Sequence, residues 1–176
     1  WRGSECGSAC GSECGIEAIH VALLLPLSGS WPVGPRIAGA AALAVERVNA
    51  DKSLLPGRRL EYSWADSGCS AEQGLTAMGK LLLQAEHRID AVIGPGCSSA
   101  CEVTAYLSGG QNIPQISYGC TSPTLSDKEK YPLFSRTVGP ETSKGPALIS
   151  LMKRYKWSKV VVLTSTDMVY FESGQG

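Results

Sequence analysis

The chain has 176 residues, of which 43% are hydrophobic and 18% charged, a balance that is typical of a folded globular domain and excludes a disordered tail. Its 16 Lys and Arg residues offset 16 Asp and Glu residues, so no net charge attracts nucleic acid or an anionic membrane surface, and we expect no nucleic-acid partner. No apolar run approaches the roughly 20 residues that cross a bilayer, so membrane attachment is expected only through segments downstream of this chain.

The N-terminal segment is rich in glycine, serine and cysteine, and residues 1–17 are predicted to be a linker. Its cysteines, Cys6, Cys10 and Cys14, are spaced by four residues, which matches no common zinc pattern. The chain holds seven cysteines but only two histidines, so we expect an oxidising compartment and no metal site. Residue 1 is not Met and no secretory signal is present, so we expect the chain to be a piece of a longer protein.

The first folded segment is predicted to be a strand–helix–strand unit. Ala18–Leu27 is a continuous apolar run of strand length, as expected of a buried parallel strand. A helix is predicted from Pro35 to Asn49–Asp51, and the turn Pro56–Gly57 leads into an alternating strand at Arg59–Ala65. The apolar face of this helix consists of Ile37, Ala41, Val45 and Val48.

A second helix is predicted to begin at a capping box formed by Ser70 and Gln73 and to run to about His87. A short strand follows at Ala91–Ile93. The inward residues of the helix are expected to be Leu75, Met78 and Leu82.

A third helix is predicted after Gly94–Ser99, because Ser99 and Glu102 form another capping box. A short strand is then predicted at Pro114–Ser117, followed by a polar loop over Tyr118–Pro132. The inward residues of the helix are expected to be Val103, Tyr106 and Leu107.

The last predicted elements are a helix after Pro140–Ser143 and a β-branched strand at Lys159–Thr164. The apolar face of the helix carries Leu148, Met152 and Tyr155. Strands that alternate with helices at this spacing predict an α/β fold with a doubly wound, mostly parallel sheet.

Three loops follow the carboxyl ends of predicted strands, where open α/β sheets bind their ligands. They are Ser28–Gly34, Gly94–Ser99 and Tyr118–Ser122, and each carries glycine and hydroxyl residues. In the middle loop, Gly94 and Gly96 allow close approach of the backbone. A candidate ligand-binding edge is therefore predicted here.

Ser98 and Ser99 stand at the start of the third helix, where hydroxyls and free amides suit a carboxylate. The alternative is that Ser99 only caps its helix. Trp31 either stacks on a ligand or packs under its own loop, and Tyr118 and Thr121 either contact the ligand or shape the turn before Pro123. The glycines match neither of the nucleotide-binding motifs GxGxxG and GxxxxGK[ST], so a nucleotide phosphate fits poorly.

No nucleophile with a positioned base emerges, and no pair of carboxylates in a cleft, so we do not expect an enzyme. Asp66 is a possible acid at the end of a strand, but a turn-forming role is favoured for it.

Several segments of the chain resemble the receptor family ligand-binding region that is shared by natriuretic-peptide, metabotropic glutamate and type B GABA receptors. The resemblance covers most of Ile19–Thr164 and implies the first lobe of a type I periplasmic-binding-like (Venus-flytrap) fold over residues 18–140. Residues 141–176 then resemble the incomplete start of a second lobe. The segments are PLSGSWPVG, AVERVN, ADSGC, IGPGCSS and SYGCTSPTLSDKEKYPLFSRTV.

Within this family the chain is most similar to the type B GABA receptors, through SGSWP, GPGCSS and SYGCTSP. The resemblance implies that Trp31 stacks on a small amino-acid-like ligand, that Ser98 holds the ligand carboxylate and that Thr121 supplies a second hydroxyl. Val138 departs from the family pattern, because the GABA-binding subunit has an imidazole at this position.

The resemblance further implies a disulfide between Cys69 and Cys97. Cys101 and Cys120 have no counterpart that we can place, so either a second bridge or two free buried thiols is expected. Through the natriuretic-peptide receptors, Ser67, Gly96 and Cys97 correspond to a buried chloride site, and we expect no other cofactor.

The function that the resemblance implies is an extracellular ligand-binding region of a plasma-membrane receptor. The leading expectation is a class C G-protein-coupled receptor that pairs with a dimer partner and signals by closure of two lobes. The alternatives are the ectodomain of a receptor guanylate cyclase, which binds a peptide, and a soluble solute-binding protein of a transporter.

Overall fold

We describe the fold from a computed structural model, in which residues 17–84 and 87–161 are placed. Except for Glu17, the predicted linker with Cys6, Cys10 and Cys14 lies outside the described residues. The elements in chain order are β1 (Glu17–Leu25), α1 (Gly34–Ala50), β2 (Arg58–Asp66), α2 (Ala71–Gln84), β3 (Ala91–Ile93), α3 (Ser98–Gly110), β4 (Gln115–Ser117), the 3-10 turn η1 (Pro123–Ser126), β5 (Phe134–Arg136), the 3-10 turn η2 (Glu141–Ser143) and α4 (Lys144–Tyr155).

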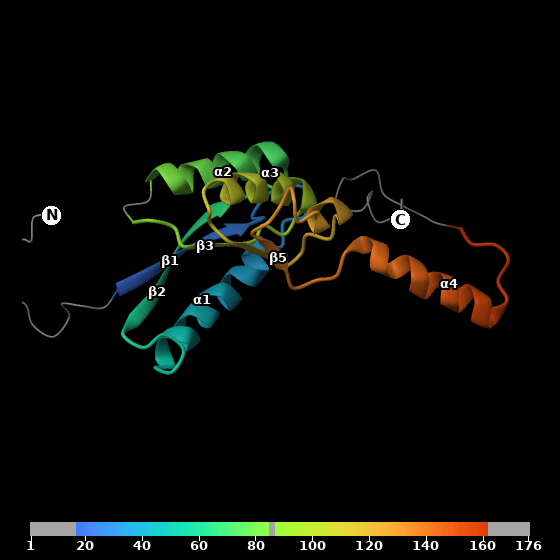
Figure 1. The fold of residues 1–176 in the computed structure, drawn as a ribbon, viewed down its shortest axis with the longest axis horizontal. Helices are drawn as coiled ribbons and strands as arrows, with labels where there is room; N and C mark the ends of the chain where they lie inside the picture. Colours follow the sequence, from blue (N-terminus) through green and yellow to red (C-terminus); the bar gives the residue numbers. More distant parts are fainter. Residues whose placement is uncertain (1–16, 85–86, 162–176) are drawn as a thin grey trace, which may run out of the picture.

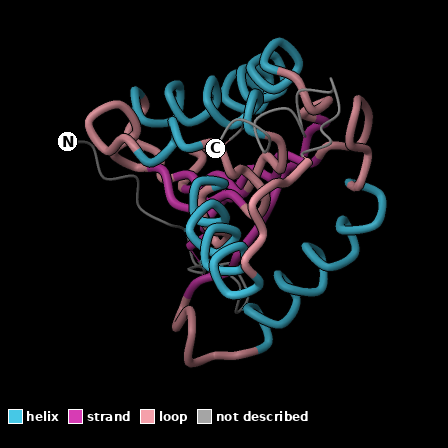
Figure 2. The backbone as a smooth tube through the Cα atoms, turned by 90° about the vertical axis from the view of Figure 1, so that its right-hand side faces the viewer, coloured by secondary structure: helices cyan, strands magenta, loops and turns pink. Residues whose placement is uncertain are grey.

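The strands form one five-stranded parallel sheet in the order β2-β1-β3-β4-β5. Helices α2 and α3 cover one face of this sheet, and α1 lies against the other (Figures 1 and 2). The arrangement confirms the predicted doubly wound α/β fold. Because every strand is parallel, all the strands end at the same edge of the sheet, and the loops that follow them meet there.

The core between the sheet and α2 depends on the apolar run of β1. Ala22 and Leu24 are fully buried on this face, where they pack with Ala77 and Met78 of α2 and with Val92 of β3. A strand that is covered on both faces has to be apolar at successive positions, which explains why β1 shows no alternation.

A second core cluster lies beneath the loop after β4. It contains the buried residues Cys101, Ala105, Cys120, Leu125, Tyr131 and Phe134. Beside it, the buried Gln115 of β4 donates to the Thr104 hydroxyl at 3.0 Å and accepts from the Ser108 hydroxyl at 3.1 Å. Because each polar group has a partner, this network fixes β4 against α3 without an unpaired buried amide.

Two of the predicted helix starts agree with the structure and one does not. Pro35 stands in the first turn of α1, and the hydroxyl of Ser70 accepts a hydrogen bond from the amide of Gln73 at 3.2 Å. The predicted cap at Ser99 is wrong: α3 begins at Ser98, after the extended residue Cys97, and the Ser99 hydroxyl instead points to the carbonyl oxygen of Cys69 at 3.5 Å. The helix thus begins two residues earlier than a cap at Ser99 would place it, and its N-cap residue Cys97 is bonded to Cys69.

Other elements differ from prediction at their ends and at the edge of the sheet. Helix α2 is described to Gln84, whereas the helix was predicted to run to about His87, and β5 was not predicted. Tyr106 was expected to face inward but is 65% exposed. Residues 159–161 of the predicted last strand are not in a strand, and the remainder lies outside the described residues.

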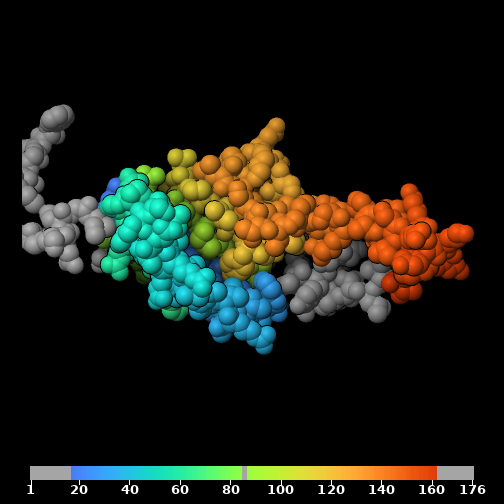
Figure 3. Space-filling view, turned by 90° about the horizontal axis from the view of Figure 1, so that it is seen from below, coloured from blue at the N-terminus to red at the C-terminus, as the bar shows by residue number. Residues whose placement is uncertain are grey.

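Helix α4 extends away from the sheet and its helices (Figures 1 and 3). None of its residues is buried, and Leu148, Leu151 and Tyr155 are each at least 44% exposed. It follows the predicted boundary between residues 140 and 141, which stays a prediction. No helix within residues 17–84 and 87–161 has the length and hydropathy that crossing a bilayer needs.

Candidate functional site

Three loops converge at the carboxyl edge of the sheet, and Gly96 stands where they meet. A Cβ atom built on Gly96 would lie 2.9 Å from the Trp31 ring and 2.9 Å from the Tyr118 ring. The two aromatic rings therefore close over the backbone of the loop after β3, and a side chain at this position would displace them. The structure thus brings Trp31 and Tyr118 together, and their role in ligand binding stays a prediction.

Tyr118 is held at its hydroxyl end. Its hydroxyl donates a hydrogen bond to the carbonyl oxygen of Leu24, the residue before the end of β1, at 3.1 Å. Burial raises the pKa of the Tyr118 phenol well above its ordinary value, so the group stays neutral over the working range of pH. Tyr118 therefore presents an anchored ring to the edge, and its hydroxyl is already engaged.

Gly94 and Pro95 set the direction of the middle loop. The peptide bond between them is cis, and Gly94 has a φ of +95° with its α-carbon against the carbonyl of Leu24, to which a built Cβ would approach within 2.2 Å. The hydroxyl of Ser117 donates to the carbonyl oxygen of Pro95 at 2.8 Å. These contacts bring the loop after β3 back toward the ends of β1 and β4.

Ser98 is half-buried in the first turn of α3, and its hydroxyl contacts the third loop. Its Oγ accepts a hydrogen bond from the amide of Ser122 at 3.1 Å. Within the described part of the chain the Ser98 proton has no acceptor, so it remains available for a ligand. A hydroxyl that already accepts a hydrogen bond is polarised as a donor, which favours an anionic ligand group.

Thr121 lies half-buried in the loop after β4, and its neighbours are held on both sides. Arg136 donates from Nη1 to the carbonyl oxygens of Cys120 and Ser122, at 3.1 and 2.8 Å. The Ser122 hydroxyl donates to Glu102 at 2.8 Å. Partial burial lowers the pKa of the Arg136 guanidinium, which nevertheless remains protonated at neutral pH.

Two disulfides join this edge of the sheet. Cys69, in the loop after β2, is bonded to Cys97, as the resemblance implies. Cys101 is bonded to Cys120, which decides between the bridge and the free thiols that the sequence left open. All four cysteines are less than 10% exposed, and both bridges end at the start of α3.

Asp66 ends β2 and organises the loop after it. Its carboxylate accepts hydrogen bonds from the amides of Leu27 and Gly68, both at 2.8 Å, and from the Ser28 hydroxyl at 2.6 Å. Burial alone would raise the pKa of Asp66, but these hydrogen bonds outweigh it and hold the pKa below its ordinary value. The favoured turn-forming role of Asp66 is confirmed, because the bond to Gly68 closes the turn.

Ser67 has the one buried hydroxyl in the described residues that lacks a hydrogen-bond partner. It is fully buried two residues before Cys69, whose disulfide brings this segment to Cys97. Gly96 and Cys97 are also buried, and their amides form no hydrogen bond within the described part of the chain. A hydroxyl and two amides without acceptors form a donor set that fits a small anion such as chloride.

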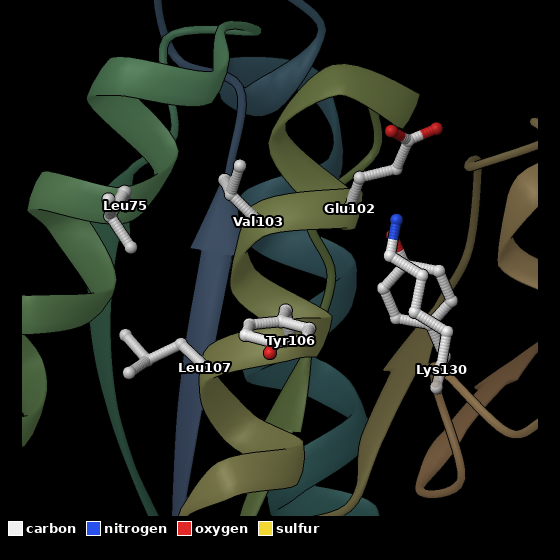
Figure 4. A pocket seen from close by; sticks show the side chains of 7 residues that line it. Leu75, Glu102, Val103, Tyr106, Leu107 and Lys130 are labelled. Atoms are coloured by element: carbon white, nitrogen blue, oxygen red, sulfur yellow. The ribbon is translucent and has the colours of Figure 1, made fainter.

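A separate hollow of about 590 Å³ lies on the outer face of α3 (Figure 4). Glu102 and Lys130 project at one end of it, and Leu75 of α2 approaches from the opposite side. The remaining lining residues are Val103, Tyr106, Leu107 and Tyr131. The surface is mostly apolar and carries one acidic and one basic side chain.

Sequence reasoning missed one residue of the candidate site and the role of two others. Ser122 was expected only as part of the loop Tyr118–Ser122, and Glu102 only as part of a capping box, whereas Arg136 was not selected from the sequence. Arg136 gives a usable signal, because a guanidinium at the end of a short, half-apolar strand needs several acceptors. Groups of three or more residues able to hold a metal ion do not occur among the described residues.

The sequence was compared with protein families and with known proteins. Residues 36–175 match the family described as the receptor family ligand binding region. The chain is 31% identical to gamma-aminobutyric acid type B receptor subunit 1 of Mus musculus over 154 residues, which are 88% of this chain and 16% of that protein.

Two further relatives carry different names. The resact receptor of Arbacia punctulata is 29% identical over 86% of this chain and 15% of its own length. Guanylate cyclase 32E of Drosophila melanogaster is 30% identical over 75% of this chain and 11% of its own length. The chain therefore spans about a sixth or less of these relatives.

Proposed function

This chain belongs to the receptor family ligand-binding region, and from that premise we propose that it is the first-lobe part of an extracellular region that binds a small amino-acid-like ligand for a membrane signalling receptor. The observation that carries the proposal is the convergence of Trp31, Gly96 and Tyr118 with the free proton of Ser98 at one edge of the sheet. Aromatic rings beside a hydroxyl donor suit a ligand with an apolar body and a carboxylate.

The ligand carboxylate binds at the start of α3. Ser98 donates its proton to one carboxylate oxygen, and the amides of the first turn of α3 lie at the positive end of the helix dipole. The Thr121 hydroxyl supplies a second polar contact, and the Trp31 ring packs on the aliphatic part of the ligand. Val138, half-buried after β5, offers no charge or hydrogen bond where the family's GABA-binding subunit has an imidazole.

Signalling follows when a second lobe closes over the ligand. The edge built by the first lobe is open, so a ligand bound there leaves much of its surface in solvent. Helix α4, with its exposed apolar side chains, begins that second lobe. Closure buries the remaining ligand surface and couples ligand binding to a change in the distance between the lobes.

The receptor is proposed to be a class C G-protein-coupled receptor at the plasma membrane, in line with the similarity to a type B receptor subunit. A receptor guanylate cyclase is the second candidate, favoured by the similarity to guanylate cyclase 32E. Ligand-stimulated formation of cyclic GMP by the full-length protein would select the cyclase. A soluble solute-binding protein is the third candidate and would show neither response.

The extracellular location rests on the two disulfides, because such bridges persist in oxidising compartments and are rare in the cytosol. The chain is proposed to bind and not to catalyse. The carboxylate of Asp66, the candidate acid, already accepts hydrogen bonds from the amides and the hydroxyl of its own loop. It is therefore not positioned to activate a nucleophile.

The partner that we propose is a second receptor subunit, docked on the hollow between α2 and α3. The relative of Mus musculus is named as a subunit, and this hollow offers an apolar centre with Glu102 and Lys130 at its rim. Tyr106 is 65% exposed there, and aromatic residues are enriched at protein interfaces. Tyr106→Arg on α3 should convert dimers to monomers in analytical ultracentrifugation, whereas Leu83→Arg, on α2 and outside the hollow, should not.

Binding is tested with the full-length protein that carries this chain. The 20 protein amino acids and 4-aminobutanoate are titrated one at a time in a calorimeter. We expect at least one to bind with a dissociation constant of about 1 mM or tighter, and Ser98→Ala to weaken it about tenfold, as loss of one hydrogen bond to a charged group predicts. Failure of all 21 compounds to bind, or full affinity in Ser98→Ala, contradicts the proposal.

A further inference from the structure

The loop that carries Thr121 has no regular secondary structure of its own to hold it. It runs from the end of β4 to η1. Buried or half-buried carbonyls outside regular secondary structure need donors from elsewhere in the protein. In this structure the guanidinium of Arg136 donates to the carbonyls of Cys120 and Ser122, and the Leu125 amide also donates to the Ser122 carbonyl at 3.3 Å.

Arg136 bridges the loop from one residue before Thr121 to one residue after it. A single nitrogen, Nη1, donates to the carbonyl oxygens of Cys120 and Ser122, while Nη2 donates to the Ser126 hydroxyl at 2.5 Å. The Cys120 carbonyl belongs to the peptide plane before Thr121, and the Ser122 carbonyl belongs to the plane after Ser122. The plane between Thr121 and Ser122 is held by the Glu141 amide, which donates to the Thr121 carbonyl at 2.9 Å, and by the Ser122 amide, which donates to Ser98. Arg136 therefore fixes the backbone at both ends of the Thr121–Ser122 segment, which restricts the direction in which the Thr121 side chain leaves the backbone.

Within residues 17–84 and 87–161 the guanidinium has no carboxylate partner. The ion pairs in these residues are Glu17 with Arg58 and Glu141 with Lys144, and neither involves Arg136. In this part of the chain its charge is therefore compensated by carbonyl and hydroxyl dipoles. A half-buried cation without a counter-ion beside a binding loop also favours an anionic ligand.

The same loop is held on its other side by independent contacts. The Ser122 amide donates to Ser98, and the Cys120 sulfur is bonded to Cys101. These contacts fix the position of Thr121 relative to Ser98 through one short loop. Both hydroxyls are the ones that the proposed function assigns to the ligand. Arg136 determines the position of the side of this loop that faces away from α3.

We propose that Arg136 is a positioning residue, which bridges the carbonyls of Cys120 and Ser122 and thereby orients the Thr121 hydroxyl toward the ligand. The inference rests on the proposed function for its ligand, but its effect on the loop does not. A lysine at this position keeps the positive charge but lacks the planar fork of donors, so it does not reproduce the bridge.

The loop itself is tested without any ligand, by amide hydrogen exchange in the full-length protein. Arg136→Lys should increase the exchange rate of the peptide that spans Thr121 and Ser122 at least about tenfold. Ser126→Ala removes only the third hydrogen bond, and Arg59→Lys changes an exposed arginine of β2, so both should leave this rate unchanged. Unchanged exchange in Arg136→Lys, or equal acceleration in Ser126→Ala, overturns the inference.

The ligand effect is tested by a double-mutant cycle on the amino acid that binds most tightly in the 21-compound titration. Arg136→Lys and Thr121→Val should each weaken binding about tenfold, and the double variant should be no weaker than Thr121→Val alone. Additive losses would show that Arg136 acts independently of Thr121. If no compound binds, the proposed function fails, while hydrogen exchange still decides the role of Arg136.

Discussion

The hydroxyl oxygen of Ser98 lies 3.1 Å from the amide nitrogen of Ser122 and accepts its hydrogen bond. This contact joins the first turn of α3 to the loop after β4, and it leaves the Ser98 proton directed elsewhere. Ser98 therefore has a structural role beside the ligand-binding role that we propose for it.

The neighbouring serine provides a matched control for Ser98. Ser99→Ala removes only a long contact to the Cys69 carbonyl, at 3.5 Å, and should change neither stability nor ligand affinity measurably. Ser98→Ala should lower the free energy of unfolding by about 1 kcal/mol, because the Ser122 amide loses its acceptor. Chemical denaturation of both variants measures the difference, and equal stability of the two would contradict it.

Gly96 is expected to tolerate no side chain. Gly96→Ala places a methyl group 2.9 Å from both the Trp31 and the Tyr118 ring, so one ring has to move. We expect loss of binding of the tightest compound by at least about tenfold, with a smaller change in stability. Gly39→Ala on α1 is the control, because a Cβ atom there meets nothing within 4 Å. Normal affinity in Gly96→Ala would show that the rings are not part of the binding site.

The bridge between Cys101 and Cys120 closes 19 residues of sequence. Replacing both cysteines with serine should lower the free energy of unfolding by about 3 kcal/mol, mainly because the unfolded chain regains entropy. Urea denaturation under non-reducing conditions measures this loss. The double replacement of Cys69 and Cys97 should cost a similar amount, since that bridge closes 28 residues. A cost below about 1 kcal/mol for either pair would mean that the bridge does not form.

Acid should weaken the loop after β2 through Asp66. The pKa of its carboxyl is lower in the folded protein than in the unfolded chain, so its stabilising contribution is complete above the unfolded value of 3.8 and is lost as pH falls through the lower folded value. Asp66→Asn should therefore flatten the decline of stability below about pH 4. Thermal melts between pH 2 and pH 7 test this, and Glu46→Gln on the exposed side of α1 is the control. An unchanged slope in Asp66→Asn would contradict the assignment.

Chloride should stabilise the protein through Ser67. Because the Ser67 hydroxyl is buried without a partner, an anion that accepts from it should raise the melting temperature when chloride replaces gluconate at constant ionic strength. Ser67→Ala should abolish this difference. Ser63→Ala, which changes a half-buried serine of β2 bonded to His20, should retain it. Equal melting in both salts, or persistence of the effect in Ser67→Ala, would exclude a chloride site here.

The parallel sheet and the order of its helices could be predicted because their signals are long and periodic. The apolar run of β1 and the stripe on α1 are both set by burial, which a sequence records directly. Tyr106 was misassigned for the same reason, since an apolar ring at helical spacing fits the core pattern. Its exposure depends on a hollow that only the packed elements define.

Several side chains of the candidate site could be selected from the sequence, but the contacts that hold its loops could not. Trp31, Ser98 and Tyr118 follow from a family resemblance and from their place after strands. The bridge from Arg136 to Cys120 and Ser122 could not be foreseen, because its acceptors are backbone carbonyls whose directions depend on φ and ψ. The capping error at Ser99 has a similar origin, because the N-cap position is taken by Cys97, whose side chain forms a disulfide and no capping hydrogen bond.

The two disulfides end four residues apart, at Cys97 and Cys101, on either side of the first turn of α3. Cys69 is therefore linked covalently to Cys120 through the first disulfide, the helical turn from Cys97 to Cys101 and the second disulfide. This connection does not depend on the segments 70–96 and 102–119. A proteolytic cut anywhere between residues 70 and 96, or between 102 and 119, leaves both fragments attached to each other. This edge of the sheet is thus expected to stay in one piece after a single proteolytic cut, even when a helix behind it has been opened, which suits the extracellular location that we propose.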